Sequence, residues 1–230
     1  MKKLILGLAM VLGAGTAASA QNIFDAGDDN HSYFGARLSL DMSCPTDVKY
    51  DNLHLKTDLL KSGAGFSAGI IYNVPVWMNL YVEPGFNLFY HTSGIEVDLL
   101  NADGTLDEDY TGASLREFGF NVPIVLGYHF DFDSVKVRAF TGPVFGVGLK
   151  GKVHYKADVN NIGMSGSDGA YGDDGGFNRG NVSWRFGAGV DYKNYTLSLF
   201  GDVEMTNAAN MGENVTMHRH SVNIALGYNF

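Results

Sequence analysis

Apolar and polar residues alternate along most of this chain. Between residues 180 and 192, large apolar side chains occupy every second position, and mostly glycine and polar residues stand between them. The stretches 114–130 and 217–230 repeat the same period of two. Successive side chains of a strand point to opposite faces, whereas a helical period would scatter both sets around a cylinder. The pattern therefore predicts β-strands with one apolar and one polar face.

Eight such segments are expected, at about 32–43, 63–73, 79–93, 114–130, 135–150, 180–192, 194–206 and 217–230. The connections alternate in length: they are short at 74–78, 131–134 and 193–194, and long at 44–62, 94–113, 151–179 and 207–216. Short turns on one side and long loops on the other are typical of transmembrane barrels. We therefore predict an all-β fold, an eight-stranded antiparallel up-and-down transmembrane β-barrel.

A soluble lipocalin-like barrel or a sandwich would also show alternation. Against these alternatives, the face opposite the large apolar residues is too small and polar for the water-facing side of strands this long. Aromatic residues also gather near the expected strand ends, which suggests an interfacial girdle. The girdle residues would be Trp77, Tyr81, Tyr128, Phe130, Tyr192 and Tyr195. In lipid, closure gives every strand backbone group an internal partner, so the membrane barrel is favoured.

The amino-terminal residues are typical of an export signal. Lys2 and Lys3 precede an apolar run that is too short to span a membrane, and Ala18 and Ala20 form a small-residue cleavage pattern before Gln21. We expect a signal peptide at 1–20, a short periplasmic segment at 21–31 and an outer-membrane barrel at 32–230. The single cysteine, Cys44, is then expected to be unpaired.

Composition excludes several classes of protein. The formal net charge of −9 argues against nucleic acid as a partner, because phosphate binding needs clustered cations. One cysteine excludes a disulfide scaffold and a thiolate zinc site. No spacing of serine, histidine and acidic residues identifies a catalytic set, so we expect neither an enzyme nor a cofactor.

The polar face of the strands should point into a lumen that side chains fill, because eight strands leave no wide channel. Charges there are costly unless they are paired. Counted from the short turns, a polar network is predicted from Arg37, Glu83, Arg185, Asp202 and Glu204. Lys136 and Arg138 lie on a strand where apolar and polar residues alternate less regularly, so their assignment to the lumen is weaker. A structural set of salt bridges is favoured over a proton path or an ion gate.

Carboxylates cluster in two of the long loops. These residues are Glu96, Asp98, Asp103, Asp107, Glu108, Asp109, Asp168, Asp173 and Asp174. Such oxygens could bind calcium, but their spacing matches no calcium loop, and a solvated acidic surface is favoured. His218 and His220 could together hold a transition metal, although no third ligand is evident, and we predict no metal site.

Several segments resemble one known family in their order along the chain. Segment 115–130 (LREFGFNVPIVLGYHF) is similar to a strand of the PorT-like outer-membrane β-barrel family. It is followed by a Gly-Pro strand at 139–146 and by a Gly-x-Gly strand with a two-residue turn at 186–195. The terminal Gly227-Tyr-Asn-Phe230 resembles the aromatic carboxy-terminal signal of many such barrels.

The resemblance implies an eight-stranded barrel of the OmpA/OmpX type in the outer membrane, and we expect this barrel to be monomeric. It also implies contact with outer-membrane lipids and recognition of Phe230 by the barrel assembly machinery. Some members of the family belong to a secretion system for surface proteins. We expect a structural or interaction role through the long extracellular loops, with a surface partner there; a narrow solute pore is the alternative.

Overall fold

The structure is a computed structural model in which residues 31–46, 48–50, 53–55, 60–95, 110–159, 162–172, 176–210 and 215–230 are described. The expected signal peptide at 1–20 and nearly all of the segment 21–31 lie outside the described residues. The acidic residues between 96 and 109 lie outside them too, as do Asp173 and Asp174, whereas Asp168 is described.

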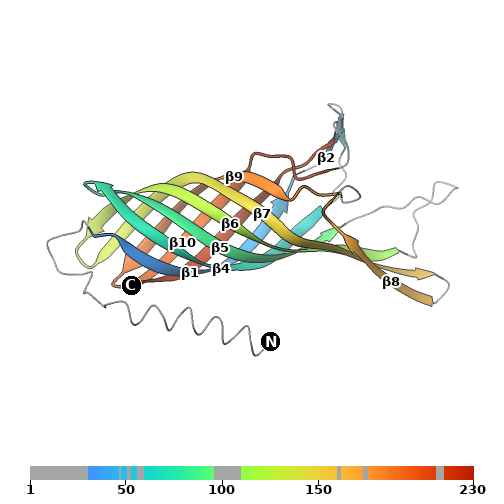
Figure 1. Ribbon diagram of the computed structural model, residues 1–230, viewed down its shortest axis with the longest axis horizontal. Helices are drawn as coiled ribbons and strands as arrows, with labels where there is room; N and C mark the ends of the chain where they lie inside the picture. The colour runs from blue at the N-terminus through green and yellow to red at the C-terminus, as the bar shows by residue number, and fades with distance from the viewer. Residues whose placement is uncertain are drawn as a thin grey trace.

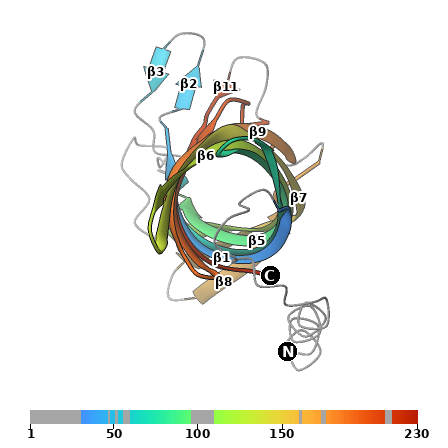
Figure 2. The same cartoon turned by 90° about the vertical axis from the view of Figure 1, so that its left-hand side faces the viewer.

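Eight antiparallel strands form a closed barrel (Figure 1). They are β1 (Tyr33–Pro45), β4 (Leu60–Trp77), β5 (Leu80–Ile95), β6 (Tyr110–Phe132), β7 (Val135–Val159), β9 (Gly180–Tyr192), β10 (Tyr195–Glu204) and β12 (Arg219–Asn229). Each pairs with the next in this order, and β1 pairs with β12, so the strands form a ring (Figure 2). The predicted fold class is confirmed.

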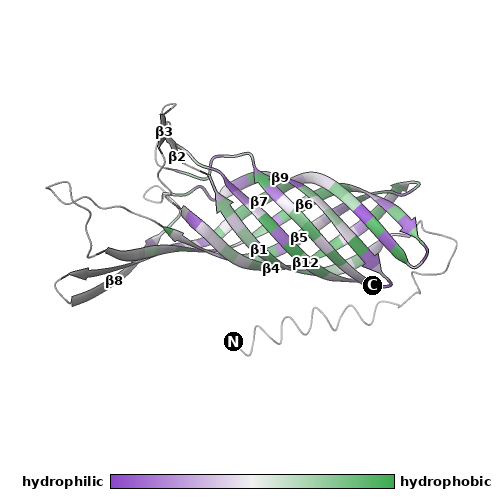
Figure 3. Ribbon diagram, turned by 180° about the vertical axis from the view of Figure 1, so that it is seen from behind, coloured by the Kyte–Doolittle hydropathy of each residue, from purple (hydrophilic) through white to green (hydrophobic). Residues whose placement is uncertain are grey.

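Hydrophobic and hydrophilic residues alternate along the barrel strands (Figure 3), and many of the large apolar side chains are exposed. Alternation along the strands places large side chains outward, so that Leu38 is 59% exposed and Leu226 is 64% exposed. The glycines, serines and charged residues between them face the lumen. Among the described residues, no helix is long and apolar enough to cross a membrane.

Tight turns join the strands at one end of the barrel. The first turn residues, Met78, Asp133 and Lys193, have φ values of 51°, 46° and 55°, in the left-handed region that such two-residue hairpins need. At the same end the Phe230 N–H donates to the Phe34 carbonyl at 2.8 Å. Short turns mark the periplasmic end of such barrels, so the other end is extracellular.

Strands at the extracellular end extend beyond the predicted boundaries. β6 begins at Tyr110 and β7 continues to Val159, where β8 (Ile162–Gly169) pairs with it as a projecting hairpin. A separate small sheet contains β2 (Val48–Tyr50), β3 (Leu53–Leu55) and β11 (Val215–Thr216). The prediction of a plain loop over 151–179 is therefore wrong. β8 is rich in glycine and serine, so it lacks the alternation that identified the other strands.

One residue of the expected aromatic girdle lies inside the barrel. Tyr81 is only 1% exposed, whereas Trp77 beside the same turn is 64% exposed. Tyr81 shares the inward parity of Glu83 on β5, and its ring stacks on His129 with the centroids 4.4 Å apart. Position near a turn was therefore a poorer guide than parity along the strand.

Candidate functional site

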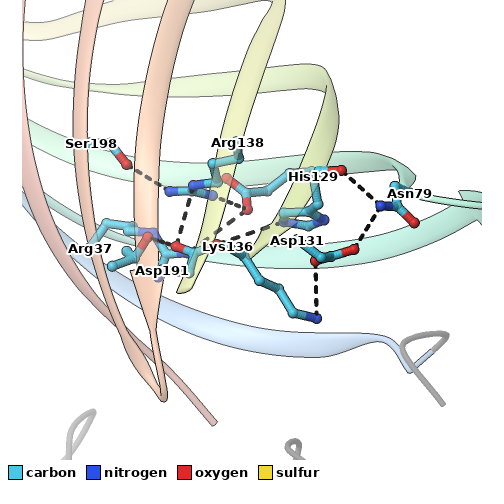
Figure 4. A network of polar contacts seen from close by, with 10 residues as sticks. Arg37, Asn79, His129, Asp131, Lys136, Arg138, Asp191 and Ser198 are labelled. Carbon is cyan, nitrogen blue, oxygen red and sulfur yellow. Dashed lines mark hydrogen bonds and ion pairs between the residues drawn. The ribbon is translucent and has the colours of Figure 1, made fainter. Parts of the chain in front are cut away.

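The periplasmic half of the lumen holds a charged cluster, which we call the lumen plug: Arg37, Glu83, His129, Arg138 and Asp191. Arg138 Nη1 lies 3.2 Å from Glu83 Oε2, and Arg138 Nε lies 3.5 Å from Asp191 Oδ1 (Figure 4). Arg37 Nη2 lies 3.8 Å from the same Glu83 oxygen, and His129 Nε2 lies 3.7 Å from Asp191 Oδ2. Two guanidinium groups thus face two carboxylates.

Further hydrogen bonds fix the plug to the barrel wall. Arg138 Nη2 donates to the Ser198 hydroxyl at 2.7 Å, and the Thr196 hydroxyl donates to Asp191. Arg138, whose side chain is only 3% exposed, thereby joins groups from β5, β9 and β10. Burying a charge is expensive unless it is paired and hydrogen-bonded, and this arrangement supplies both.

Glycines make room for the large side chains of the plug. A Cβ at Gly127 would lie 2.1 Å from the Tyr81 ring, and one at Gly227 would lie 2.5 Å from Arg37 Cδ. Such distances are far below van der Waals contact, so these positions accept no side chain without displacing a neighbour. The plug residue Arg37 and the neighbouring Tyr81 therefore fit because glycine stands opposite each of them.

A second charged pair lies in the lumen on the extracellular side of the plug. Arg185 donates to Asp202 through Nε at 2.7 Å and through Nη2 at 2.8 Å, which is a bidentate contact. The Arg185 guanidinium carbon also lies 3.9 Å from the centre of the Phe200 ring. This pair lies between a cavity of about 40 Å³ beside the plug and one of about 130 Å³ toward the extracellular end.

The upper cavity ends at a third polar group. Arg219 Nη1 donates to one oxygen of Glu117, and the Tyr171 hydroxyl donates to the other at 2.5 Å. The Arg219 backbone N–H donates to Glu204 at 2.6 Å. Burial, and after it the charge of Glu117, raises the pKa of Tyr171, so its hydroxyl keeps the proton that it donates.

An apolar cluster packs over this polar group, and we call it the outer cap: Ile95, Leu115, Ala170, Phe177, Ala208, Ala209 and Met217. Leu115 and Met217 have no exposed surface. Leu115 comes from β6, and most of the other members come from segments between the strands. The cap therefore joins the connecting segments to the inner wall of the barrel.

Two asparagines tie those segments together. Asn207 Oδ1 accepts from the N–H groups of Ala209 and Met217 at 3.0 and 2.9 Å, and Asn207 Nδ2 donates to Val215 O at 2.6 Å. Asn178 Nδ2 donates to the carbonyls of Asn207 and Ala209, both at 2.9 Å. These bonds satisfy backbone groups of the segments that connect the barrel strands.

The five residues predicted to form one lumen network lie at three levels. Arg37 and Glu83 belong to the plug, Arg185 and Asp202 form the middle pair, and Glu204 binds at the top. The described contacts join the members within each level. All five line the lumen, but they are not one hydrogen-bonded unit in the described part of the chain.

Other lumen residues were missed or ranked too low from the sequence. Arg138, given only a weak inward assignment, is the centre of the plug, and Arg219 was not placed inside at all. An inward aromatic residue, Phe140, had blurred the alternation on the strand of Arg138. The rings of His218 and His220 stack at 6.5 Å, and no group of three potential metal ligands occurs among the described residues.

Comparison with known proteins gives one family match. The model of a family described as outer membrane protein beta-barrel domain matches residues 32–208. A search of curated protein sequences gave no match.

Three solved structures that are similar to this chain are distant from it in sequence. OprG from Pseudomonas aeruginosa is 12% identical, with 87% of this chain and 97% of that chain covered and a TM-score of 0.45. Ail, the attachment invasion locus protein of Yersinia pestis, is 15% identical, with 87% and 99% covered and a TM-score of 0.38. Neisserial surface protein A is 13% identical, with 86% and 97% covered and a TM-score of 0.38.

Proposed function

This chain belongs to the outer membrane β-barrel family, and on that basis we propose that it is a sealed barrel acting through its extracellular parts. The protein is a transmembrane barrel of the OmpA/OmpX type and lies in the outer membrane. The proposed role is interaction with a partner at the cell surface, without a catalytic step and without steady conduction of solutes.

One observation carries this proposal: both ends of the lumen are obstructed while strands project beyond the barrel. The lumen plug lies in the periplasmic half of the lumen, and the outer cap packs connecting segments against the inner wall at the extracellular end. The β7–β8 hairpin and the small β2–β3–β11 sheet project beyond the end of the barrel (Figure 1). Side chains that close the lumen do not favour the transport of solutes through it. Strands that project beyond the barrel offer a surface that a partner can recognise.

Planar-bilayer recording of the refolded protein tests the closure. The wild-type barrel is expected to insert without steady conductance at neutral pH. A shift in gel mobility between unboiled and boiled samples checks that the inserted protein is folded. Steady conductance of folded wild-type protein would overturn the proposal.

A trimmed barrel tests the role of the hairpin. Residues 155–166 are replaced by Asn-Gly, so that the His154–Ser167 pair flanks a two-residue turn. This variant should keep its heat-dependent mobility and should lose any surface partner that the immobilised wild-type barrel retains. Equal retention by both proteins would contradict a role for the hairpin.

The second candidate is a narrow pore for small solutes. Cavities of about 70, 40 and 130 Å³ at successive levels of the lumen favour it, because rearranged side chains could connect them. In that case Glu83→Ala or Arg185→Ala would change a conductance already present in the wild type. A silent wild-type protein would eliminate this alternative.

Membership of the PorT-like branch, with a part in protein secretion, is a narrower proposal. It is supported by the order of the motifs at 115–130, 139–146 and 186–195. Deletion of the encoding gene should then leave surface proteins of the secretion system in the periplasm. Normal surface display in the deletion strain would contradict it.

A further inference from the structure

Three cations stand together on the outer face of the barrel, and we call them the rim cations: Arg116, Lys150 and Lys152. All three side chains are exposed. Arg116 on β6 lies directly opposite Lys152 on β7, and Lys150 lies opposite Phe118, two residues nearer the periplasmic end. The register thus places three positive charges on one face of two neighbouring strands.

This arrangement is unfavourable without an anion. Like charges directly opposite each other across an antiparallel pair destabilise the sheet. The described part of the chain provides no carboxylate in an ion pair with any rim cation, although other arginines in it have such partners. The cluster is also unusual for a chain whose net charge is −9.

The rim cations lie at the upper edge of the apolar band. Exposed apolar side chains follow the outer face of β6 from Phe130 at 46% exposure to Phe118 at 38%, and Leu149 on β7 is 47% exposed. For a tilted strand this stretch of β6 rises about 30 Å, close to the height of the band that faces lipid. Arg116 follows Phe118 on the outer face, at the level of the lipid headgroups.

The other described cations of the barrel strands and turns are placed elsewhere. Arg37, Arg138, Arg185 and Arg219 line the lumen, and Lys136 and Lys193 lie near the short turns. Two lysines are exceptions: Lys61, whose side chain lies beside Gly94 at the same extracellular end, and Lys156, which follows Lys152 along β7. Positive charge on the outer surface is therefore concentrated at the extracellular edge of the band.

We infer that the rim cations bind the phosphate groups of a phosphorylated glycolipid in the outer leaflet, of the lipid A class. A guanidinium can hold phosphate through two parallel hydrogen bonds, and the lysines add mobile point charges. Their apolar stems can lie along the band while the charged groups reach the headgroups. A bound phosphate between Arg116 and Lys152 removes the repulsion between them.

Lipid binding to the full-length protein in non-ionic detergent tests this site. Bisphosphorylated lipid A, dephosphorylated lipid A and inorganic pyrophosphate are each titrated, and bound lipid is counted by native mass spectrometry. The triple variant Arg116→Ser, Lys150→Ser, Lys152→Ser is compared with Lys193→Asn, which removes a cation at the opposite end and suits a left-handed turn position. The wild type and the control should bind the bisphosphorylated lipid at least tenfold more tightly than the triple variant.

A second readout separates binding from a folding defect. Without lipid, the triple variant should unfold at the same temperature as the wild type or at a higher one, because the repulsion is gone. With bisphosphorylated lipid A, only the wild type and the control should gain stability. If the triple variant does not show heat-dependent mobility, the double variant Lys150→Ser, Lys152→Ser replaces it.

Three results would overturn the inference. One is equal affinity of the wild type and the triple variant for bisphosphorylated lipid. Another is equal affinity of the wild type for the dephosphorylated lipid. A third is pyrophosphate binding as tight as lipid binding, which would indicate a free phosphate ligand instead of a membrane lipid.

Discussion

The lumen plug and the outer cap obstruct the same lumen with opposite chemistry. The plug consists of paired charges on the barrel strands, with Arg138 between Glu83 and Asp191. The cap is apolar, and Leu115 and Met217 pack within it against segments that connect the strands. The ion pairs of the plug depend on the direction in which their groups meet, whereas the apolar contacts of the cap do not.

The difference in chemistry follows from the part of the chain that carries each closure: the plug is carried by barrel strands, and the cap mostly by connecting segments. A strand in a closed ladder holds its side chains at fixed positions, so ionic groups can meet with the geometry that burial demands. Connecting segments lack that constraint, and apolar packing tolerates small shifts because it has no preferred direction. Asparagine side chains then supply the few directional bonds that the cap requires.

The strongest test of this comparison removes the central cation of the plug. Arg138→Met should destabilise the barrel by about 3–5 kcal/mol, because Glu83 and Asp191 would stay buried without their partner. Urea unfolding in lipid vesicles, followed by the fluorescence of Trp77 and Trp184, gives the change. Lys136→Met is the matched control and should cost less than about 1 kcal/mol, since its contact with Asp131 at 3.9 Å is partly exposed.

A deletion in the cap should have the next largest effect. Leu115→Ala leaves a cavity in a fully buried cluster and should cost about 3 kcal/mol. The same unfolding assay measures it. Leu226→Ala removes an equal volume from the lipid-facing side, where Leu226 is 64% exposed, and should cost clearly less. Equal losses would mean that the cap does not pack as an interior.

The polar ties of the cap can be tested separately from its packing. Asn207→Ala removes the acceptor for two backbone N–H groups and should cost about 1–2 kcal/mol. Hydrogen exchange at Ala209 and Met217 should accelerate, while exchange in the strands of the plug stays unchanged. Uniform acceleration would show that the two closures unfold together. Ser167→Ala, at an exposed position on β8, is the control.

Salt should produce the smallest effect. Raising the ionic strength from about 0.1 to 1 M shortens the screening length of exposed charges but hardly affects buried pairs. The stability difference between wild type and Arg138→Met should therefore change by less than about 0.5 kcal/mol. A large change would place the plug charges in contact with bulk water.

The sequence predicted the barrel well because alternation depends only on each strand by itself. The outward assignments of Leu226 and Phe186 and the short turn at Lys193-Asn194 follow from local pattern and hold in the structure. These features need no knowledge of which strand neighbours which.

Contacts inside the lumen could not be predicted in the same way. The pairing of Arg138 with Glu83 depends on how the strands are staggered around the closed ring, and no single strand contains that information. Tyr81 was misplaced because its nearness to a turn outweighed its parity. The cap depends on Ala170, Phe177 and Ala208, which lie in segments without any periodic signal.

The pairing of β1 with β12, which closes the barrel, constrains the order in which this protein can fold. It pairs Gly35 with Asn229, so the ring closes only after the two most distant strands of the barrel have met. Contacts so remote in sequence slow folding, and the final pairing must follow delivery of nearly the entire chain. Until then β1 and β12 expose unpaired backbone that lipid cannot satisfy. The barrel is therefore complete only when its last strand, β12, has paired with β1.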